Sequence, residues 1–208
     1  MRRIASTLIG LLIAGCVVAA QEHDTHAKPA AKTGGASAAK IRDAMSAAPA
    51  AISKNAMIMD WPDKAGAPMK QLRAGTNGWM CMPSTGAGGG IGADPMCLDK
   101  AFSGWADAWM NKKDPQTTTV GTGYMLRGDK GASNSDPFAE GATPTNQWVV
   151  SGPHIMVIVP NAAQLDAYPT DPQNGGPFVM WKGTKYAHLM VPVAAMPKPA
   201  AATGAAPK

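Results

Sequence analysis

The feature that most constrains this chain is a series of short apolar runs separated by turn residues. The runs are rich in β-branched, aromatic and methionine residues, which is typical of strands. Many of the connections between them are short and contain glycine, proline or asparagine, and the pair Asn77-Gly78 favours a tight hairpin. The sequence therefore predicts a mostly antiparallel sheet. The predicted strands lie within residues 51–60, 69–74, 79–82, 117–126, 148–159, 178–182 and 186–193.

One segment has the periodicity of an amphipathic helix. Apolar side chains recur at helical spacing at Leu98, Phe102, Trp105 and Trp109. Asp94 and Pro95 fit the N-cap and the first helical position, and Asp114-Pro115 would stop the helix. Gly104 within it suggests a close approach of another backbone. We predict an α+β fold with this helix packed on one face of the sheet.

The N-terminal residues have the pattern of an export signal. Arg2 and Arg3 precede an uncharged apolar stretch that runs to Ala20 and is too short for a stable membrane span. Cleavage after Ala20 would release a soluble chain. Alternatively, the residues ending at Cys16 resemble a lipobox, and cleavage there would make Cys16 the first residue and attach a lipid to it. That lipid would be the only link between the protein and the membrane. By either route we expect an exported protein of the periplasm or cell envelope.

The remaining cysteines agree with an oxidising compartment. Cys81 and Cys97 allow a single disulfide, which would stabilise the fold by about 3 kcal/mol. The alternative is a pair of buried free thiols.

Composition divides the rest of the chain into a spacer, one domain and a tail. Residues 21–49 form a spacer rich in alanine, lysine and proline, in which 37–48 would be a short helix or part of the spacer; residues 50–193 form the domain, and 194–208 a disordered tail. The formal charge is +5, but residues 50–193 contain eleven basic and eleven acidic side chains. The excess therefore lies in the signal and tails, and no clustered cations indicate a nucleic-acid partner.

A repeated His-x-Met pattern carries the most specific chemistry. His154 and Met156 form one copy, and His188 and Met190 form the other. In a strand, residues two apart point to the same face, so each copy would present an imidazole beside a thioether. Imidazole and thioether groups are suitable copper ligands, and the thioether favours the cuprous ion. The four side chains could form one copper site if the two strands are neighbours in the sheet. The alternative role is core packing by methionine and hydrogen bonding by histidine.

The other sequence signals do not define a reaction. There is no G-x-S-x-G or H-E-x-x-H motif, and the glycine-rich stretch 86–92 lacks the lysine and hydroxyl residue of a phosphate-binding loop. A hydrolase or lyase would have to use His154 or His188 as its general base. We expect instead a non-enzymatic module that binds a small ligand or an envelope protein through these histidines and the loop 128–145.

Four longer motifs carry a resemblance to a family of proteins. Ser151-Gly152-Pro153-His154-x-Met156 and the run from Val179 through Met180-Trp181-x-Gly183-Thr184-x-Tyr186-Ala187-His188-x-Met190 to Val193 resemble an uncharacterised family of exported bacterial proteins. Asn77-Gly78-Trp79-x-Cys81-Met82-Pro83 and Asp94-Pro95-Met96-Cys97-Leu98-Asp99 share this resemblance, which spans roughly residues 50–193. It implies no assigned activity, fold or ligand.

Overall fold

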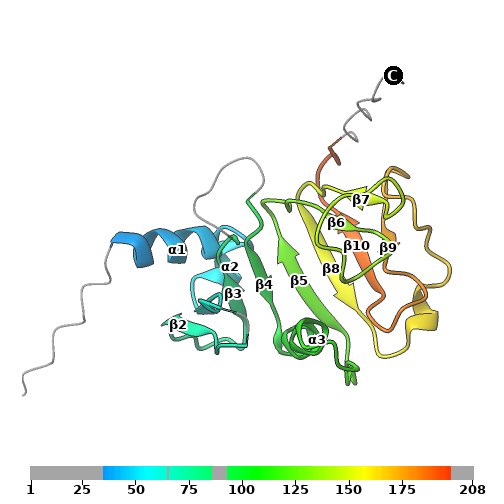
Figure 1. The fold of residues 1–208 in the computed structure, drawn as a ribbon. Helices are drawn as coiled ribbons and strands as arrows, with labels where there is room; N and C mark the ends of the chain where they lie inside the picture. Colours follow the sequence, from blue (N-terminus) through cyan, green and yellow to red (C-terminus); the bar gives the residue numbers. More distant parts are fainter. Residues whose placement is uncertain (1–34, 65, 86–92, 198–208) are drawn as a thin grey trace, which may run out of the picture. The chain divides into compact units, whose positions relative to one another are not determined.

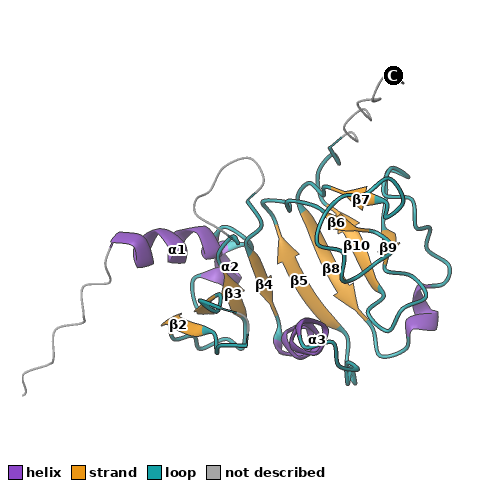
Figure 2. Cartoon of the chain, viewed as in Figure 1, coloured by secondary structure: helices purple, strands orange, loops and turns teal. Residues whose placement is uncertain are grey.

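The computed structural model describes residues 35–64, 66–85 and 93–197, and these form an α+β domain around one large sheet (Figures 1 and 2). The eight strands of the sheet follow the order β2-β1-β3-β4-β5-β8-β10-β9. Every neighbouring pair is antiparallel except β1 and β3. The predicted fold class, the mostly antiparallel sheet and the disulfide are thereby confirmed.

The elements have the following bounds. The helices are α1 (Gly35–Met45), α2 (Ala50–Ser53), α3 (Lys100–Met110) and the 3-10 turn η1 (Ala162–Leu165). The strands of the large sheet are β1 (Met57–Asp60), β2 (Lys70–Arg73), β3 (Met80–Met82), β4 (Met96–Leu98), β5 (Gly121–Met125), β8 (His154–Ile158), β9 (Phe178–Met180) and β10 (His188–Pro192). Two short strands, β6 (Ala132–Ser133) and β7 (Trp148–Val149), pair with each other separately.

The expected hairpin at Asn77-Gly78 is not a hairpin between adjacent strands. Strands β2 and β3 lie on opposite sides of β1, so the connection between them crosses over, although Gly78 does adopt a positive φ of 77°. A Cβ on Gly75 would lie 2.0 Å from the backbone nitrogen of Met57, so the crossing chain needs glycine there. Turn residues encode a local change of direction, but they do not select the strand that the next segment pairs with.

Helix α3 begins later than the sequence predicted, and this corrects the expected cap. Residues 96–98 are strand β4, because Cys97 pairs with Cys81 and Leu98 with Met80 across the ladder to β3. The N-cap is Asp99, whose carboxylate accepts a hydrogen bond from the backbone N–H of Phe102 at 2.8 Å.

Two other expectations around α3 were wrong. Asp94 does not cap the helix; its carboxylate instead accepts from the backbone N–H of Thr85 and lies 3.2 Å from the ammonium of Lys130. Gly104 marks no close approach, since nothing lies within 4 Å of a Cβ built on it. The close approach lies across the interface, where a Cβ on Gly121 would come 2.7 Å from the backbone nitrogen of Phe102.

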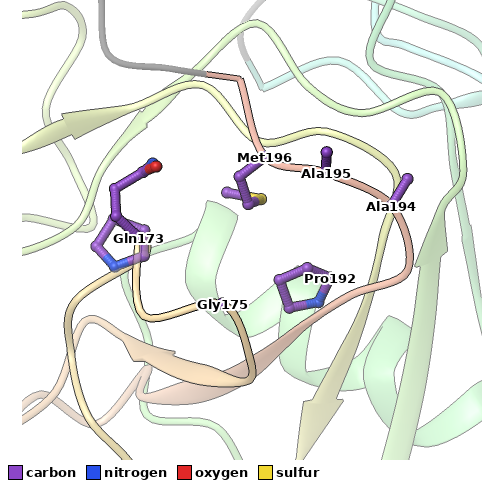
Figure 3. A pocket seen from close by; sticks show the side chains of 7 residues that line it. Gln173, Gly175, Pro192, Ala194, Ala195 and Met196 are labelled. Carbon is purple, nitrogen blue, oxygen red and sulfur yellow. The ribbon is translucent and has the colours of Figure 1, made fainter.

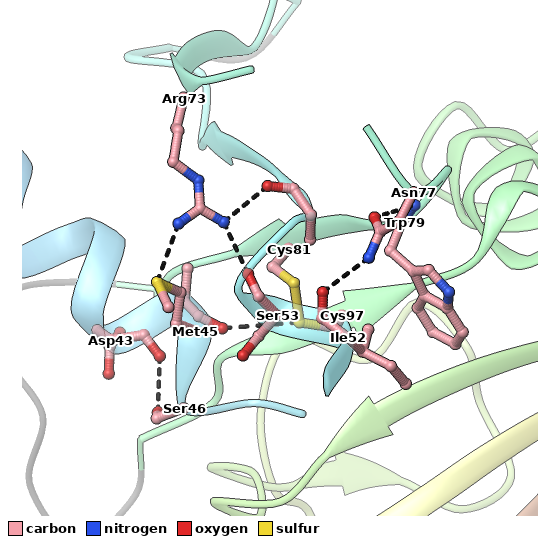
Figure 4. Close-up of a disulfide and its surroundings, with 12 residues drawn as sticks. Asp43, Met45, Ser46, Ile52, Ser53, Arg73, Asn77, Trp79, Cys81 and Cys97 are labelled. Carbon is pink, nitrogen blue, oxygen red and sulfur yellow. Dashed lines mark hydrogen bonds between the residues drawn. A yellow bond between two sulfur atoms is a disulfide. The ribbon is translucent and has the colours of Figure 1, made fainter. Parts of the chain in front are cut away.

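The two faces of the sheet bury different cores. Helix α3 covers one face through Phe102, Trp105 and Ala106, which pack with the methionines of the sheet. Alternation along β3 and β4 directs Cys81 and Cys97 to the other face, where their disulfide packs with α1 (Figure 4).

Helix α1 and the residues after Val193 extend the folded unit at both ends. Ala44 and Ala47, in and just after α1, are fully buried, so ordered packing starts ahead of the expected boundary at residue 50. Met196 packs against the main core, in the segment expected to be a tail. None of the helices in the described part of the chain is both long and apolar enough to cross a membrane.

Candidate functional site

The strands that carry the two His-x-Met copies are neighbours. Strand β8 pairs antiparallel with β10, and the register sets Met156 directly opposite Met190 and His154 opposite Pro192. All four motif side chains are buried, with at most 8 % of their surface exposed. The repeated motif therefore forms one patch on the face of the sheet that α3 covers.

The register does not bring all four side chains to one point. Since His154 pairs with position 192, it lies four residues along the ladder from His188, which is roughly 13 Å in the strand direction. The methionine pair occupies the centre of the patch, and one imidazole lies at each end.

The patch lines a cavity of about 390 Å³ between the sheet, α3 and the loop 127–149. Its walls are mainly apolar and contain much more sulfur and indole than charge. The lining includes the two histidines His154 and His188, the six methionines Met96, Met110, Met125, Met156, Met180 and Met190, and the five tryptophans Trp61, Trp105, Trp109, Trp148 and Trp181.

Both imidazoles are fixed by the same backbone contact. The Nδ1 of His154 lies 2.7 Å from the carbonyl oxygen of Gly152, and the Nδ1 of His188 lies 3.0 Å from that of Tyr186. A carbonyl only accepts, so Nδ1 carries the proton in each ring and Nε2 carries the lone pair. The Nε2 of His154 is buried without a hydrogen-bond partner in the described part of the chain, so its lone pair is free.

Burial keeps both imidazoles neutral. It lowers the pKa of His188 to about 4, although the hydrogen bond to the Tyr186 carbonyl acts in the opposite direction, and repulsion from a protonated His154 adds to the lowering. Burial also lowers the pKa of His154, although the nearby Asp129 carboxylate acts in the opposite direction. The pKa of Asp129 is itself raised by burial. At neutral pH the cavity therefore presents two neutral nitrogen donors.

Hydrogen bonds from two tryptophans hold the loop 127–149 over the cavity. The indole N–H of Trp181 donates to the carbonyl of Ser133 at 2.7 Å, and that of Trp109 donates to Pro137 at 2.9 Å. At the base of the loop, the Asp129 carboxylate accepts from the backbone N–H groups of Gly131 and Ser151. The predicted loop 128–145 thus forms a wall of the cavity that these hydrogen bonds fix in place.

The cavity lining contains more thioethers than imidazoles or carboxylates. Within residues 35–64, 66–85 and 93–197, no three His, Cys, Asp or Glu side chains come together in an arrangement that could hold an ion. The cavity lining instead combines two imidazoles with six thioethers. Spacing from histidine predicted Met156 and Met190, whereas Met125 and Met180 were missed because their only sequence signal is a position within a predicted strand.

The other predicted positions lie away from the cavity. The Cys81–Cys97 disulfide is on the opposite face of the sheet, surrounded by α1, α2 and Arg73 (Figure 4). Cys16 falls outside the described residues. A smaller hollow of about 170 Å³ is formed by residues 172–175 and 192–196 and contains no ionisable side chain (Figure 3).

Comparisons with known proteins identified no relative of this chain. No protein-family model matches the chain, and neither the curated proteins nor the solved structures searched contain a significant match.

Proposed function

We propose that the protein is a non-enzymatic Cu(I)-binding module whose ligands are the methionines and histidines of the cavity. The observation that carries this proposal is the convergence of both His-x-Met copies on one buried patch, where the Nε2 of His154 has no partner. A buried polar atom of this kind costs free energy unless a ligand satisfies it.

The donor set favours a soft monovalent ion. Thioethers select Cu(I) over harder ions, and a neutral imidazole donates without competition from a proton. The hydrogen bonds from Nδ1 to Gly152 and Tyr186 orient the rings in the way that outer-shell contacts orient metal-bound histidines. Apolar walls of indole and methionine would limit water access to the bound ion.

A hydrolase or lyase is the weaker candidate. A general base works best with a pKa near the ambient pH, whereas burial moves the pKa of both histidines in the wrong direction. The Nδ1 atoms are engaged by backbone carbonyls and not by a carboxylate. Binding therefore accounts for the geometry better than catalysis does.

Copper binding fits the compartment that the sequence predicts. An export signal would carry the domain to an oxidising environment, and the disulfide is consistent with such an environment. We propose a location in the periplasm or cell envelope, with Cu(I) itself as the small ligand.

The experiment is a Cu(I) titration against a competing chromophoric chelator. Ascorbate maintains the cuprous state and leaves the disulfide intact, so Cys81 and Cys97 contribute no thiols. The doubly substituted His154→Ala/His188→Ala and Met156→Leu/Met190→Leu proteins should each lose affinity by more than about tenfold. Met59→Leu, a change outside the cavity lining, is the matched control. Equal Cu(I) uptake by wild type and both double variants would refute the proposal.

A further inference from the structure

Each imidazole of the cavity has a second thioether beside it that the repeated motif does not include. Met125 on β5 is directly opposite His154 on β8, and Met180 on β9 is directly opposite His188 on β10. Both methionines are buried and both line the same cavity. Cα atoms of directly opposed residues lie about 4.5–5.5 Å apart, so each pair is close enough to share an ion.

The ladder thus contains two equivalent sets of three ligands. The first set is His154, Met125 and Met156, and the second is His188, Met180 and Met190. In each set one methionine lies across the ladder from the histidine and the other lies two residues along the same strand. An approximate two-fold axis between Met156 and Met190 relates the sets, because β8 and β10 are antiparallel.

We propose that the cavity binds two Cu(I) ions, one on each of these sets. This inference rests on the proposed function. The offset of roughly 13 Å between the histidine positions disfavours one shared ion, whereas it leaves room for two separate three-coordinate centres. Each set offers one nitrogen and two sulfur donors, and the Asp129 side chain also lines the cavity.

The surroundings make the two centres distinguishable by fluorescence. The ring of His188 contacts both Trp105 and Trp181, with centroid distances of 5.3 and 4.9 Å. In the described residues His154 has no such aromatic contact. An ion on the second set should therefore quench tryptophan emission more strongly than an ion on the first.

The test combines binding stoichiometry with tryptophan fluorescence in Met125→Leu and Met180→Leu. Leucine preserves apolar volume, so the fold should tolerate both changes, and circular dichroism and thermal unfolding verify this. Wild type should take up two equivalents of Cu(I) from the competing chelator. Met125→Leu should take up one equivalent and keep the quenching, whereas Met180→Leu should take up one equivalent and lose most of it. Met59→Leu should behave as wild type.

The outcomes separate this inference from the proposal on which it rests. One equivalent in wild type, unchanged in both variants, would overturn the two-ion site but leave Cu(I) binding established. No uptake by wild type would overturn both. Two equivalents that persist in both variants would show that Met125 and Met180 are not ligands, and would also overturn the inference.

Discussion

The stability of the folded domain should fall steeply in mild acid because His188 is buried in its neutral form. An unfolded histidine binds its proton below a pH of about 6.5, whereas in the folded protein burial lowers the pKa of His188 to about 4. Between these values the unfolded state binds more protons, so the free energy of unfolding decreases as pH falls through this window. A shift of this size corresponds to a loss of roughly 3 kcal/mol from this residue.

The assay is urea denaturation at a series of pH values for wild type and His188→Gln, which keeps a polar side chain but does not titrate. Other groups, including His154 and Asp129, titrate in both proteins, so the difference between the two pH profiles reports mainly the titration of His188. The wild-type profile should be steeper between about pH 6.5 and 4. Parallel profiles would refute the reasoning, because they would mean that His188 titrates as it does in the unfolded chain.

Three further predictions concern the scaffold. Replacing both Cys81 and Cys97 with alanine should lower the free energy of unfolding by about 3 kcal/mol, measured by chemical denaturation. A thiol reductant should have no further effect on the variant, and a denaturation midpoint equal to that of wild type would contradict the prediction. Gly104→Ala should raise that free energy by about 1 kcal/mol, since the position is exposed, helical and unobstructed, and a loss would reveal a contact at this position. Asp99→Ala should cost about 2 kcal/mol in the same assay, because it removes the cap of Phe102 and the acceptor for the Thr122 N–H, whereas Asp99→Asn should cost less.

Local sequence patterns predicted the helices and strands better than they predicted which strands pair with each other. The alternating and β-branched runs identified most of the strands but not β4 or β6, and the apolar stripe identified Trp105 and Trp109 as one helix face, since these patterns depend only on neighbouring residues. The crossover between β2 and β3 was missed because pairing on both sides of β1 depends on distant segments. The start of α3 was misplaced because the ladder between β3 and β4 overrides the helical signal around Leu98.

The candidate site was partly predictable for the same reason. The His-x-Met spacing shows which side chains share a face within one strand, and that information is local. Whether β8 and β10 are neighbours, and by how many residues they are offset, follows only from the whole sheet. Met125, Met180 and Asp129 therefore could not be assigned to the cavity from the sequence, since other strands and a loop bring them there.

The placement of α1 on the disulfide face of the sheet has a practical consequence for binding measurements with the protein immobilised on a surface. A linker or affinity tag joined ahead of Gly35 attaches to the side of the sheet that carries Cys81 and Cys97, with the strand backbones between it and the methionine cavity. Sensor chips and fusion partners anchored there should leave the cavity wall unobstructed, whereas an anchor on the loop 127–149 would block it.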